Sequence, residues 1–402
     1  MSSDQSLEQV VVVGAGVAGT RAAETLRQDG YDGALTIVGA ERQAPYHRPP
    51  LSKKLLTGQV HRAGIDMAPQ FDLDARVLRG ASALGVDTSS RSVRVSDEGR
   101  DLSLHFDGLV IASGATAREW PGSAVPDGVM LLRTVDDCLA IRQRLASRPK
   151  VLVIGGGFIG AEVSASCRSL GLEVALIGKA TGPLMSALGP ELAQRWADLH
   201  RGHGVDLRVG VGVDAFIGDG RVEAVRLDDG SQLAADLVII GLGVTPATDW
   251  LNGSGLQLDD GVICDATGAA EGIVNVVAAG DVARWWHPLY EQHLRVEHWD
   301  HAARQGVAAA RTLLAGRDRA TAYDDVPYFW SDQYDVKLQM LGFPSGYDAF
   351  EIVEGDPDSW QFIAAYGRGG RTIAALGTTR DRVYAYREAI TKRAEFPPKP
   401  AD

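Results

Sequence analysis

The chain has 402 residues, 45% of them hydrophobic and 23% charged, which is the balance of a soluble globular protein and predicts two or three domains. Its formal net charge of −12 argues against nucleic acid or an anionic membrane as the main partner. The three cysteines form no C-x-x-C pair, so we expect neither a disulfide framework nor a redox dithiol. The polar N-terminus carries no signal segment, which predicts a cytoplasmic protein, and we expect no metal site.

Two apolar segments, VVVVGAGVAG at 10–19 and VLVIGGGFIG at 151–160, each end in G-x-G-x-x-G. Each begins with a β-branched run that is too short for a helix, as expected of a strand buried in a parallel sheet. Helical spacing follows at 20–30 and 161–171, and each helix is followed by a further strand. The alternative is a pair of glycine-rich turns in an ordinary α/β protein. Two fingerprints in this strand–helix–strand context instead predict two dinucleotide-binding units.

Further apolar strands are expected at 107–115, 235–246 and 272–283, each closed by small residues. Near residue 323 the composition changes to aromatic residues and short strand-like alternations, which predict a separate α+β domain. The expected fold class is therefore α/β, with two Rossmann-like domains followed by a C-terminal α+β domain. The predicted boundaries are 1–117 with 246–322 for the first, discontinuous domain, 118–245 for the second and 323–402 for the third, in which 395–402 is read as a tail.

The first glycine-rich loop has the features of a pyrophosphate cradle. Gly14 permits the tight turn, Gly16 lets the backbone approach a pyrophosphate, and Gly19 lets helix and strand pack closely. The helix N-terminus then offers unpaired N–H groups and the positive end of a dipole. Glu41 stands 22 residues beyond Gly19 and could accept hydrogen bonds from ribose hydroxyls, although a solvated surface glutamate is the alternative.

A second feature follows in PYHRPPLSK at 45–53. Arg48 and Lys53 flank two prolines, whose stiffness could hold two cations over a cofactor. The alternative is a rigid turn that carries two surface cations.

The chain resembles the FAD-dependent ferredoxin reductases of the putidaredoxin reductase type, within the pyridine nucleotide–disulfide oxidoreductase superfamily, over nearly its whole length. The segments that carry the resemblance are GAGVAG, PYHRPPLSK, IASGA, LRTVDD, GGGFIGAEV, GVTP, AAGDVA, EHWDHA and VPYFWSDQYDVKLQMLG. The resemblance implies FAD in the first unit, NADH or NADPH in the second, and an interface role for the C-terminal domain. It implies hydride transfer from the nicotinamide to FAD, followed by single-electron transfer to a [2Fe–2S] ferredoxin that serves a P450 or Rieske oxygenase.

The resemblance also implies roles for single residues. Asp281 of GDVA would hydrogen-bond the ribityl or phosphate region of FAD, on a loop expected to open a helix. Without the resemblance, Trp299 and Trp330 would each be interpreted as a core or interface aromatic residue. The full flavin set is Gly14, Gly16, Ala18 and Gly19 on the pyrophosphate, Glu41 on the ribose, and Arg48, Lys53, Arg133, Asp281, Trp299 and Trp330 around the flavin.

In the second unit, Gly155, Gly157 and Gly160 repeat the cradle, and Phe158 and Ile159 of the same segment are also candidate nucleotide-binding residues. Glu162 is expected on the first helical turn, where the resemblance places a glutamate close to the nicotinamide carboxamide. A helix N-terminal acid stabilised by the dipole is the alternative, and the two roles are compatible. Lys53 and Glu162 are the candidate catalytic residues, because Lys53 would stabilise the electron-rich reduced flavin.

At the end of the next strand, similar reductases usually carry an acid that binds both ribose hydroxyls. This chain has Gly178 and then Lys179. The absence of this acid removes one or two charge-assisted hydrogen bonds to the ribose, each contributing about 1.5–3 kcal/mol. It also removes the repulsion between the acid and a 2′-phosphate. We therefore expect the second site to tolerate or prefer NADPH, with Lys179 on the 2′-phosphate, although a solvated lysine would look identical.

Two other functions stay open at this point. One is an NAD(P)H reductase of a small molecule, such as a quinone, oxygen or a pathway intermediate. The other is an FAD-bearing interaction protein with a weakened nicotinamide site. Because ferredoxins are usually acidic and this chain is acidic too, the ferredoxin hypothesis also requires a local Lys/Arg patch beside the flavin.

Overall fold

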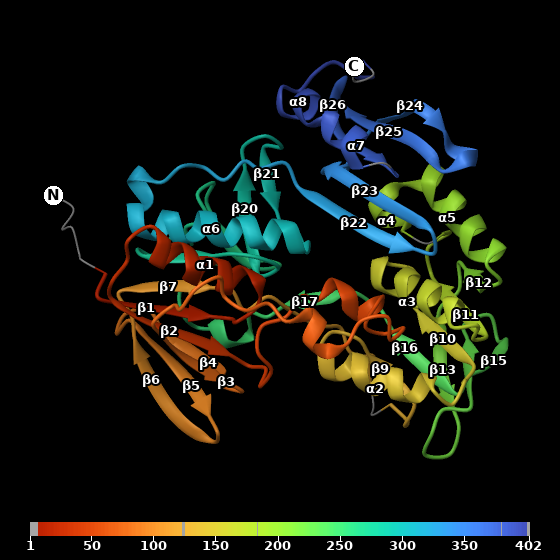
Figure 1. Ribbon diagram of the computed structural model, residues 1–402, viewed down its shortest axis with the longest axis horizontal. Coiled ribbons are helices and arrows are strands. Elements are labelled where there is room, and N and C mark those ends of the chain that lie inside the picture. Colours follow the sequence, from red (N-terminus) through yellow and green to blue (C-terminus); the bar gives the residue numbers. More distant parts are fainter. Residues whose placement is uncertain (1–6, 123–124, 183, 379, 400–402) are drawn as a thin grey trace. The chain divides into compact units, whose positions relative to one another are not determined.

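The computed structural model describes residues 7–122, 125–182, 184–378 and 380–399 (Figure 1). The chain forms two compact units. The first comprises Met1–His47, Asp66–Thr116 and Thr245–Phe329, and the second comprises Arg48–Ile65, Ala117–Val244 and Trp330–Asp402. The three-domain division expected from the sequence stays a prediction, and the C-terminal segment groups here with the second unit.

The first unit is built on a five-stranded parallel sheet of order β19-β7-β1-β2-β3. Helices α1 and α6 cover one face of this sheet (Figure 1). Its central strands are buried except for the exposed Gln9 at the start of β1, as expected of a sheet covered on both faces. The elements are β1 (Gln9–Val13), α1 (Val17–Gln28), β2 (Ala34–Gly39), β3 (Ala75–Arg79), β7 (Gly108–Ile111), β19 (Val276–Ala278) and α6 (Trp299–Ala315).

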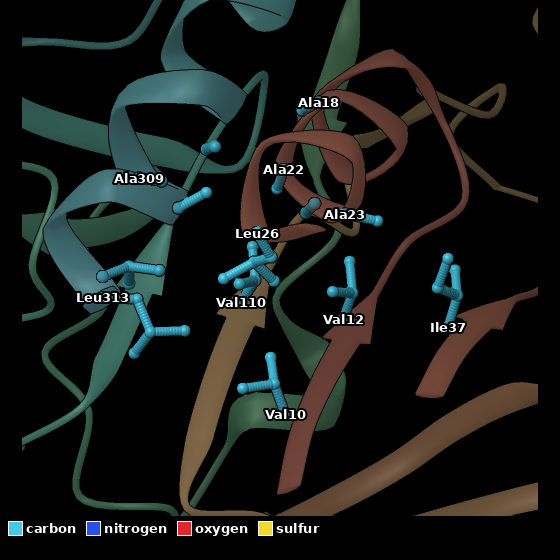
Figure 2. Packing of buried hydrophobic residues seen from close by; sticks show 14 of the residues in the cluster. Val10, Val12, Ala18, Ala22, Ala23, Leu26, Ile37, Val110, Ala309 and Leu313 are labelled. Atoms are coloured by element: carbon cyan, nitrogen blue, oxygen red, sulfur yellow. The ribbon is translucent and has the colours of Figure 1, made fainter. Parts of the chain in front are cut away.

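Small residues bring α1 and α6 together over the sheet. Figure 2 shows Ala18 and Ala22 of α1 near Ala309 of α6, with the valines of β1 beneath them. An ideal Cβ on Gly306 would overlap the carbonyl oxygen of Ala18, so only glycine fits where the two helices approach. This packing fixes the start of α1, which carries the first glycine-rich loop.

The remaining strands of the first unit form two three-stranded sheets. The GDVA loop at 280–283 leads into strand β20, so the expected helix at this point is wrong. The reason is that ARWWH pairs in parallel with β18 and antiparallel with β21, and its side chains alternate between buried and less buried positions. The two sheets comprise β4 (Ser82–Asp87), β5 (Ser92–Asp97) and β6 (Arg100–His105), and β18 (Val262–Cys264), β20 (Ala283–His287) and β21 (Gln292–Leu294).

The second unit repeats the arrangement with a five-stranded parallel sheet of order β12-β11-β10-β16-β9. A three-stranded sheet, β13-β14-β15, packs against its core. The two parallel sheets confirm the predicted pair of Rossmann-like units. The elements are β9 (Val129–Leu131), α2 (Val135–Leu145), β10 (Val151–Ile154), α3 (Phe158–Ser169), β11 (Val174–Gly178), α4 (Met185–Leu188), α5 (Pro190–Gly202), β12 (Asp206–Val209), β13 (Val213–Ile217), β14 (Ala224–Leu227), β15 (Gln232–Ala234) and β16 (Leu237–Ile240).

The C-terminal segment forms a five-stranded sheet of order β22-β23-β26-β25-β24 with two short helices, which confirms the predicted α+β domain. The Tyr366 hydroxyl donates to the Leu188 carbonyl oxygen at 2.9 Å, and Trp360 packs edge-on against Trp196 of α5. The elements are β22 (Tyr328–Gln333), β23 (Val336–Gly342), β24 (Ala349–Asp356), β25 (Gln361–Arg368), β26 (Arg371–Gly377), α7 (Arg380–Ala385) and α8 (Arg387–Thr391).

The segment read as a tail is partly attached to this sheet, so that expectation is wrong for its first residues. Glu395 pairs with Arg371, and the Phe396 N–H donates to the Gly370 carbonyl oxygen at 3.0 Å. Gly367 lacks a side chain at the point where the Phe396 ring packs. Residues 400–402 lie outside the described residues.

Two further strands, β8 (Ala115–Ala117) and β17 (Val244–Pro246), pair with each other. Short 3₁₀ turns occur at Pro49–Ser52, Arg62–Ile65, Asp249–Leu251, Arg317–Arg319 and Pro357–Ser359. Among the described residues, no helix combines the length and the apolar composition that a bilayer crossing requires.

Candidate functional site

In the first glycine-rich loop, the fold requires glycine at positions 14 and 19 but not at position 16. Gly14 has φ +119°, and an ideal Cβ there would overlap the Ala112 carbonyl oxygen. A Cβ on Gly19 would overlap the Gly14 carbonyl oxygen. Gly16, by contrast, has φ −74° and ψ −171°, which any residue adopts, and its ideal Cβ has no atom within 4 Å apart from those of Gly16 and its two chain neighbours. The open side of Gly16 therefore fits a ligand that approaches the backbone closely, as a pyrophosphate does.

The second glycine-rich loop has the same geometry. Gly155 has φ +107°, and a Cβ there would overlap the Gly241 carbonyl oxygen, while a Cβ on Gly160 would overlap the Gly155 carbonyl oxygen. Gly157 has φ −74° and ψ −175°, and its ideal Cβ likewise has no atom within 4 Å apart from those of Gly157 and its two chain neighbours. The N-cap residues of α1 and α3 are Gly16 and Gly157, which have no side chain that could cap the helix, and the start of a helix favours an anion such as a phosphate.

Two exposed aliphatic side chains occur at the second loop. Ile159, which the sequence predicted, is 42% exposed, and Leu242 is 37% exposed. The Leu242 backbone adjoins Gly155, since its nitrogen lies 3.4 Å from the ideal Cβ of that glycine. Such apolar groups suit the rings of a nucleotide. Leu242 was missed from sequence, although an apolar residue just past the carboxyl end of a central strand is a usable signal. Phe158 is the first residue of α3 and is half-buried.

Glu41 is held in place by a neighbour. The Tyr46 hydroxyl donates to Glu41 Oε2 at 2.5 Å, and Glu41 lies just beyond the end of β2. Tyr46 is itself buried, so it restricts the carboxylate. The description of Glu41 as a freely solvated surface residue therefore does not hold.

The Asp281 loop lies beside the start of α1. Asp281 follows Gly280, whose ideal Cβ would lie 3.1 Å from the Cβ of Ala18. Ala18 is buried in the first turn of α1. The fold thus brings Asp281 close to the first glycine-rich loop, as a shared cofactor site requires.

The start of α6 carries a buried polar atom that lacks a partner. His298 precedes the helix, and among the described residues its Nδ1 has no hydrogen-bond partner. Desolvation lowers the pKa of His298 to about 4, so the ring is neutral near pH 7. Trp299 follows, with its ring 5.2 Å from the His47 ring. Trp330 is half-buried in β22 and belongs to the second unit, so a joint role of the two tryptophans stays a prediction.

The PYHRPPLSK segment places its two cations by separate contacts. Arg48 Nη1 donates to the Arg133 carbonyl oxygen at 2.8 Å, so these two predicted site residues lie together. Lys53 Nζ lies 2.6 Å from Glu162 Oε2 and donates to the Pro49 carbonyl oxygen at 3.2 Å. The Lys53 side chain is only 14% exposed, which rules out the alternative of a solvated surface cation for this residue.

Glu162 is a buried carboxylate with three donors. The helix α3 begins at Phe158, so Glu162 lies in its second turn. The expectation that Glu162 lies on the first turn is therefore wrong. Besides Lys53, the Ser52 hydroxyl donates to Glu162 Oε2 at 2.5 Å and the Ser331 hydroxyl donates to Oε1 at 2.7 Å. Side-chain partners, and not the helix dipole, therefore hold this acid. Neither serine was predicted, and no local pattern marks them.

A directed chain of hydrogen bonds extends from Glu162 to the end of α5. Gln333 Nε2 donates to Ser331 Oγ at 3.1 Å, so Gln333 Oε1 is left to accept from His200 Nε2 at 3.0 Å. His200 Nδ1 then accepts from the Tyr334 hydroxyl at 3.0 Å. Desolvation lowers the pKa of the fully buried His200 to about 4, so the ring stays neutral and this network assigns its tautomer. These hydrogen bonds make the Glu162 carboxylate a rigid part of the second unit.

None of the three cysteines has the features of a reactive thiol. All three are free and buried. Desolvation raises the pKa of both Cys138 and Cys167 to about 12 and raises the pKa of Cys264 as well. Since the thiolate is the reactive form, a thiol relay finds no support among these groups.

The strand-end positions of the second unit are as the sequence predicted. Gly178 is the last residue of β11, and Lys179 is exposed directly after it. The strand that leads into the cradle, β10, ends just before Gly155, and it pairs in parallel with β11, which ends at Gly178.

Comparison with known proteins agrees with this arrangement. The profile of the pyridine nucleotide-disulphide oxidoreductases matches residues 8–306, and that of the reductase C-terminal region matches residues 328–401. A ferredoxin–NAD(P)(+) reductase of a Sphingomonas species is 37% identical over 387 residues, covering 94% of this chain and 92% of that protein. Putidaredoxin reductase of Pseudomonas putida is 34% identical over 377 residues, covering 91% and 87%. The structure of a covalent putidaredoxin reductase–putidaredoxin complex matches with a TM-score of 0.89 at 32% identity, covering 96% of this chain and 93% of the matched chain. The chain therefore belongs to the pyridine nucleotide-disulphide oxidoreductase family.

Proposed function

We propose that this protein is an FAD-dependent NAD(P)H:ferredoxin oxidoreductase that supplies electrons, through a [2Fe–2S] ferredoxin, to a P450 or Rieske oxygenase. The observation that carries the proposal is the pair of cradles in which Gly16 and Gly157 have no structural need to be glycine. The names and the coverage of the relatives point to the same activity. We also infer a cytoplasmic location, because the cysteines are free and the chain is acidic.

The first unit is proposed to hold FAD. The N–H groups at the start of α1 bind the pyrophosphate, and Glu41, oriented by Tyr46, accepts hydrogen bonds from the ribose. Asp281 lies beside this loop and takes the ribityl or phosphate region. The unpaired Nδ1 of His298 offers a further polar contact at the start of α6. When bound, FAD supplies the chemistry, since it accepts a hydride and releases electrons one at a time.

The second unit is proposed to hold the nicotinamide nucleotide. Gly155, Gly157 and Gly160 form the pyrophosphate cradle, and Ile159 offers an exposed apolar surface to the rings. The Glu162 carboxylate has about four acceptor positions, of which three are used, so one is left for an amide N–H such as that of a carboxamide.

Lys53 is proposed to act through its charge. Glu162 holds the ammonium group in a position that is largely shielded from solvent. A positive charge in such a site interacts more strongly with negative charge on a reduced cofactor than it would in water. Arg48 and Arg133, which lie together, are proposed to complete the set.

Electrons are proposed to leave without a sulfur relay. The described structure has no cysteine pair poised for exchange, because each thiol is buried and its pKa is raised. The acceptor is therefore reduced directly, and salt should weaken the reduction of an acidic ferredoxin steeply if a local cationic patch binds it.

An anaerobic titration of the purified yellow protein tests the proposal. NADH or NADPH should bleach the flavin absorbance within seconds, and addition of a [2Fe–2S] ferredoxin should restore it. A colourless protein that cannot be reconstituted with FAD would contradict the proposal. Turnover with quinones but with no ferredoxin would instead support a small-molecule reductase, and a flavin that neither nucleotide bleaches would support an interaction protein.

A further inference from the structure

The two cradles can be compared residue by residue, because in each unit the strand before the glycine-rich loop pairs with the next strand in the same way. Val13 pairs with Val38 in the first sheet, and Ile154 pairs with Ile177 in the second. Residues 39–41, which read Gly-Ala-Glu, therefore correspond to residues 178–180, which read Gly-Lys-Ala. The segment that ends in the ribose-binding acid in the first unit has no acid in the second and carries a cation instead.

The fold does not require glycine at position 178. An ideal Cβ there would lie 3.5 Å from the Gly156 nitrogen and 3.8 Å from its Cα, which are ordinary van der Waals contacts. A side chain at this position would therefore point toward the glycine-rich loop without a clash. In dinucleotide-binding units an acid in this region binds the ribose 2′-hydroxyl, and an adjacent cation accommodates a 2′-phosphate. Glycine leaves the space open and uncharged.

Lys179 is the uncommitted cation of this region. An ideal Cβ on the buried Gly212 would collide with Lys179 Cε and lie 2.8 Å from Asp228 Oδ2, so the lysine stem covers Gly212 close to that carboxylate. Among the residues that the structure describes, no ion pair involves Lys179. Neighbouring arginines are engaged, since Arg208 binds Asp206 at 2.7 and 3.0 Å and Arg226 Nη2 lies 2.7 Å from Asp214 Oδ2.

We propose that the second unit selects a nicotinamide nucleotide that carries a 2′-phosphate, so that NADPH is the preferred electron donor. Lys179 binds the phosphate as a point charge, and Gly178 admits it. The exposed Thr181, two residues further along, has a hydroxyl able to donate a second hydrogen bond. This inference rests on the proposed function, because it specifies the donor for the same reaction.

Binding of two fragments to the FAD-loaded protein tests the inference apart from turnover. Adenosine 2′,5′-bisphosphate and AMP differ only in the 2′-phosphate, and calorimetry should show the bisphosphate binding at least tenfold more tightly at low salt. The difference should shrink as salt rises. K179A should remove the difference while the affinity for AMP stays within twofold of the wild type, and G178E should make AMP the tighter ligand.

Lys150→Ala is the matched control, because this exposed lysine lies at the opposite, amino end of β10 and should leave both affinities unchanged. Equal affinity for the two fragments, an unchanged ratio in K179A, or a kcat/KM for NADH more than tenfold above that for NADPH would overturn the inference. In each of these cases, flavin bleaching by NADH would leave the proposed reductase function standing. Failure of both nucleotides to reduce the flavin would refute the proposed function itself.

Discussion

The buried pair of Lys53 and Glu162 allows a prediction with a magnitude. The two side chains are 14% and 5% exposed, and their charged atoms lie 2.6 Å apart. Removing one partner of a buried ion pair costs about 3–5 kcal/mol, because the other charge stays buried without compensation. Glu162→Gln keeps the shape and one acceptor oxygen but removes the charge, and Lys53 retains some solvent access. We therefore expect a loss at the lower end, about 3 kcal/mol.

The pair should also show coupling. Lys53→Met removes the opposite charge and leaves the carboxylate with its two serine donors. We expect the double variant Lys53→Met/Glu162→Gln to be less destabilised than the sum of the two single variants, since neither charge is then left alone. The difference between the double variant and the sum of the single variants measures the interaction between Lys53 and Glu162.

Thermal unfolding in excess FAD measures both effects. For a unit of this size, each kcal/mol shifts the midpoint by about 2–4 °C, so Glu162→Gln should lower it by about 6–12 °C. Midpoints are compared at one scan rate, because a two-unit chain need not unfold in a single reversible step. The control is the exposed pair of Lys150 and Glu173, at 3.9 Å, where Glu173→Gln should shift the midpoint by less than about 2 °C.

Two results would refute this reasoning. One is a shift for Glu162→Gln no larger than that for Glu173→Gln. The other is a double variant whose loss equals the sum of the two single losses. Either result would mean that the Lys53–Glu162 contact is solvated in solution and that its charges are screened.

Three further predictions follow from the same structure. Gly16→Ala should leave the fold intact, because its Cβ meets open space, yet lower the FAD content of the purified protein. Gly19→Ala should prevent folding, since its Cβ overlaps the Gly14 carbonyl oxygen. Circular dichroism and flavin absorbance separate the two, and a folded Gly16→Ala protein with full flavin would contradict the cradle. His200 has a folded-state pKa of about 4 against an ordinary 6.5, so its stabilising contribution is complete above pH 6.5 and is lost as pH falls toward 4. The urea midpoint of His200→Gln should therefore fall less between pH 7 and pH 5 than that of the wild type. Equal falls in the two midpoints would argue against this sign. Asp228→Asn should strengthen the binding of adenosine 2′,5′-bisphosphate several-fold, because it removes a negative charge close to the Lys179 stem that would repel the 2′-phosphate. Calorimetry would show the gain, and weaker binding would mean that Asp228 orients the lysine.

The predictions from sequence succeeded where a local pattern fixes backbone geometry. The fold class, the two cradles and the strand that ends at Gly178 all follow from short glycine and β-branched patterns. The errors at the GDVA loop and at the C-terminal tail occurred where a partner elsewhere in the chain decided the outcome. The GDVA loop opens a strand because β18 and β21 pair with the residues after it. Phe396 is attached because Gly367 leaves room for its ring.

The sequence by itself determined that this chain has two nucleotide cradles, that it has no close pair of cysteines, and that the second strand end carries Lys179 where an acid is usual. Those features are read from neighbouring positions along the chain. Only the tertiary structure decided that Gly16 and Gly157 are free of any steric demand from the protein, and that Ser52 and Ser331 hold Glu162. The two serines lie 110 and 169 residues from that glutamate. A hydrogen bond depends on distance in space, which spacing along the chain does not encode.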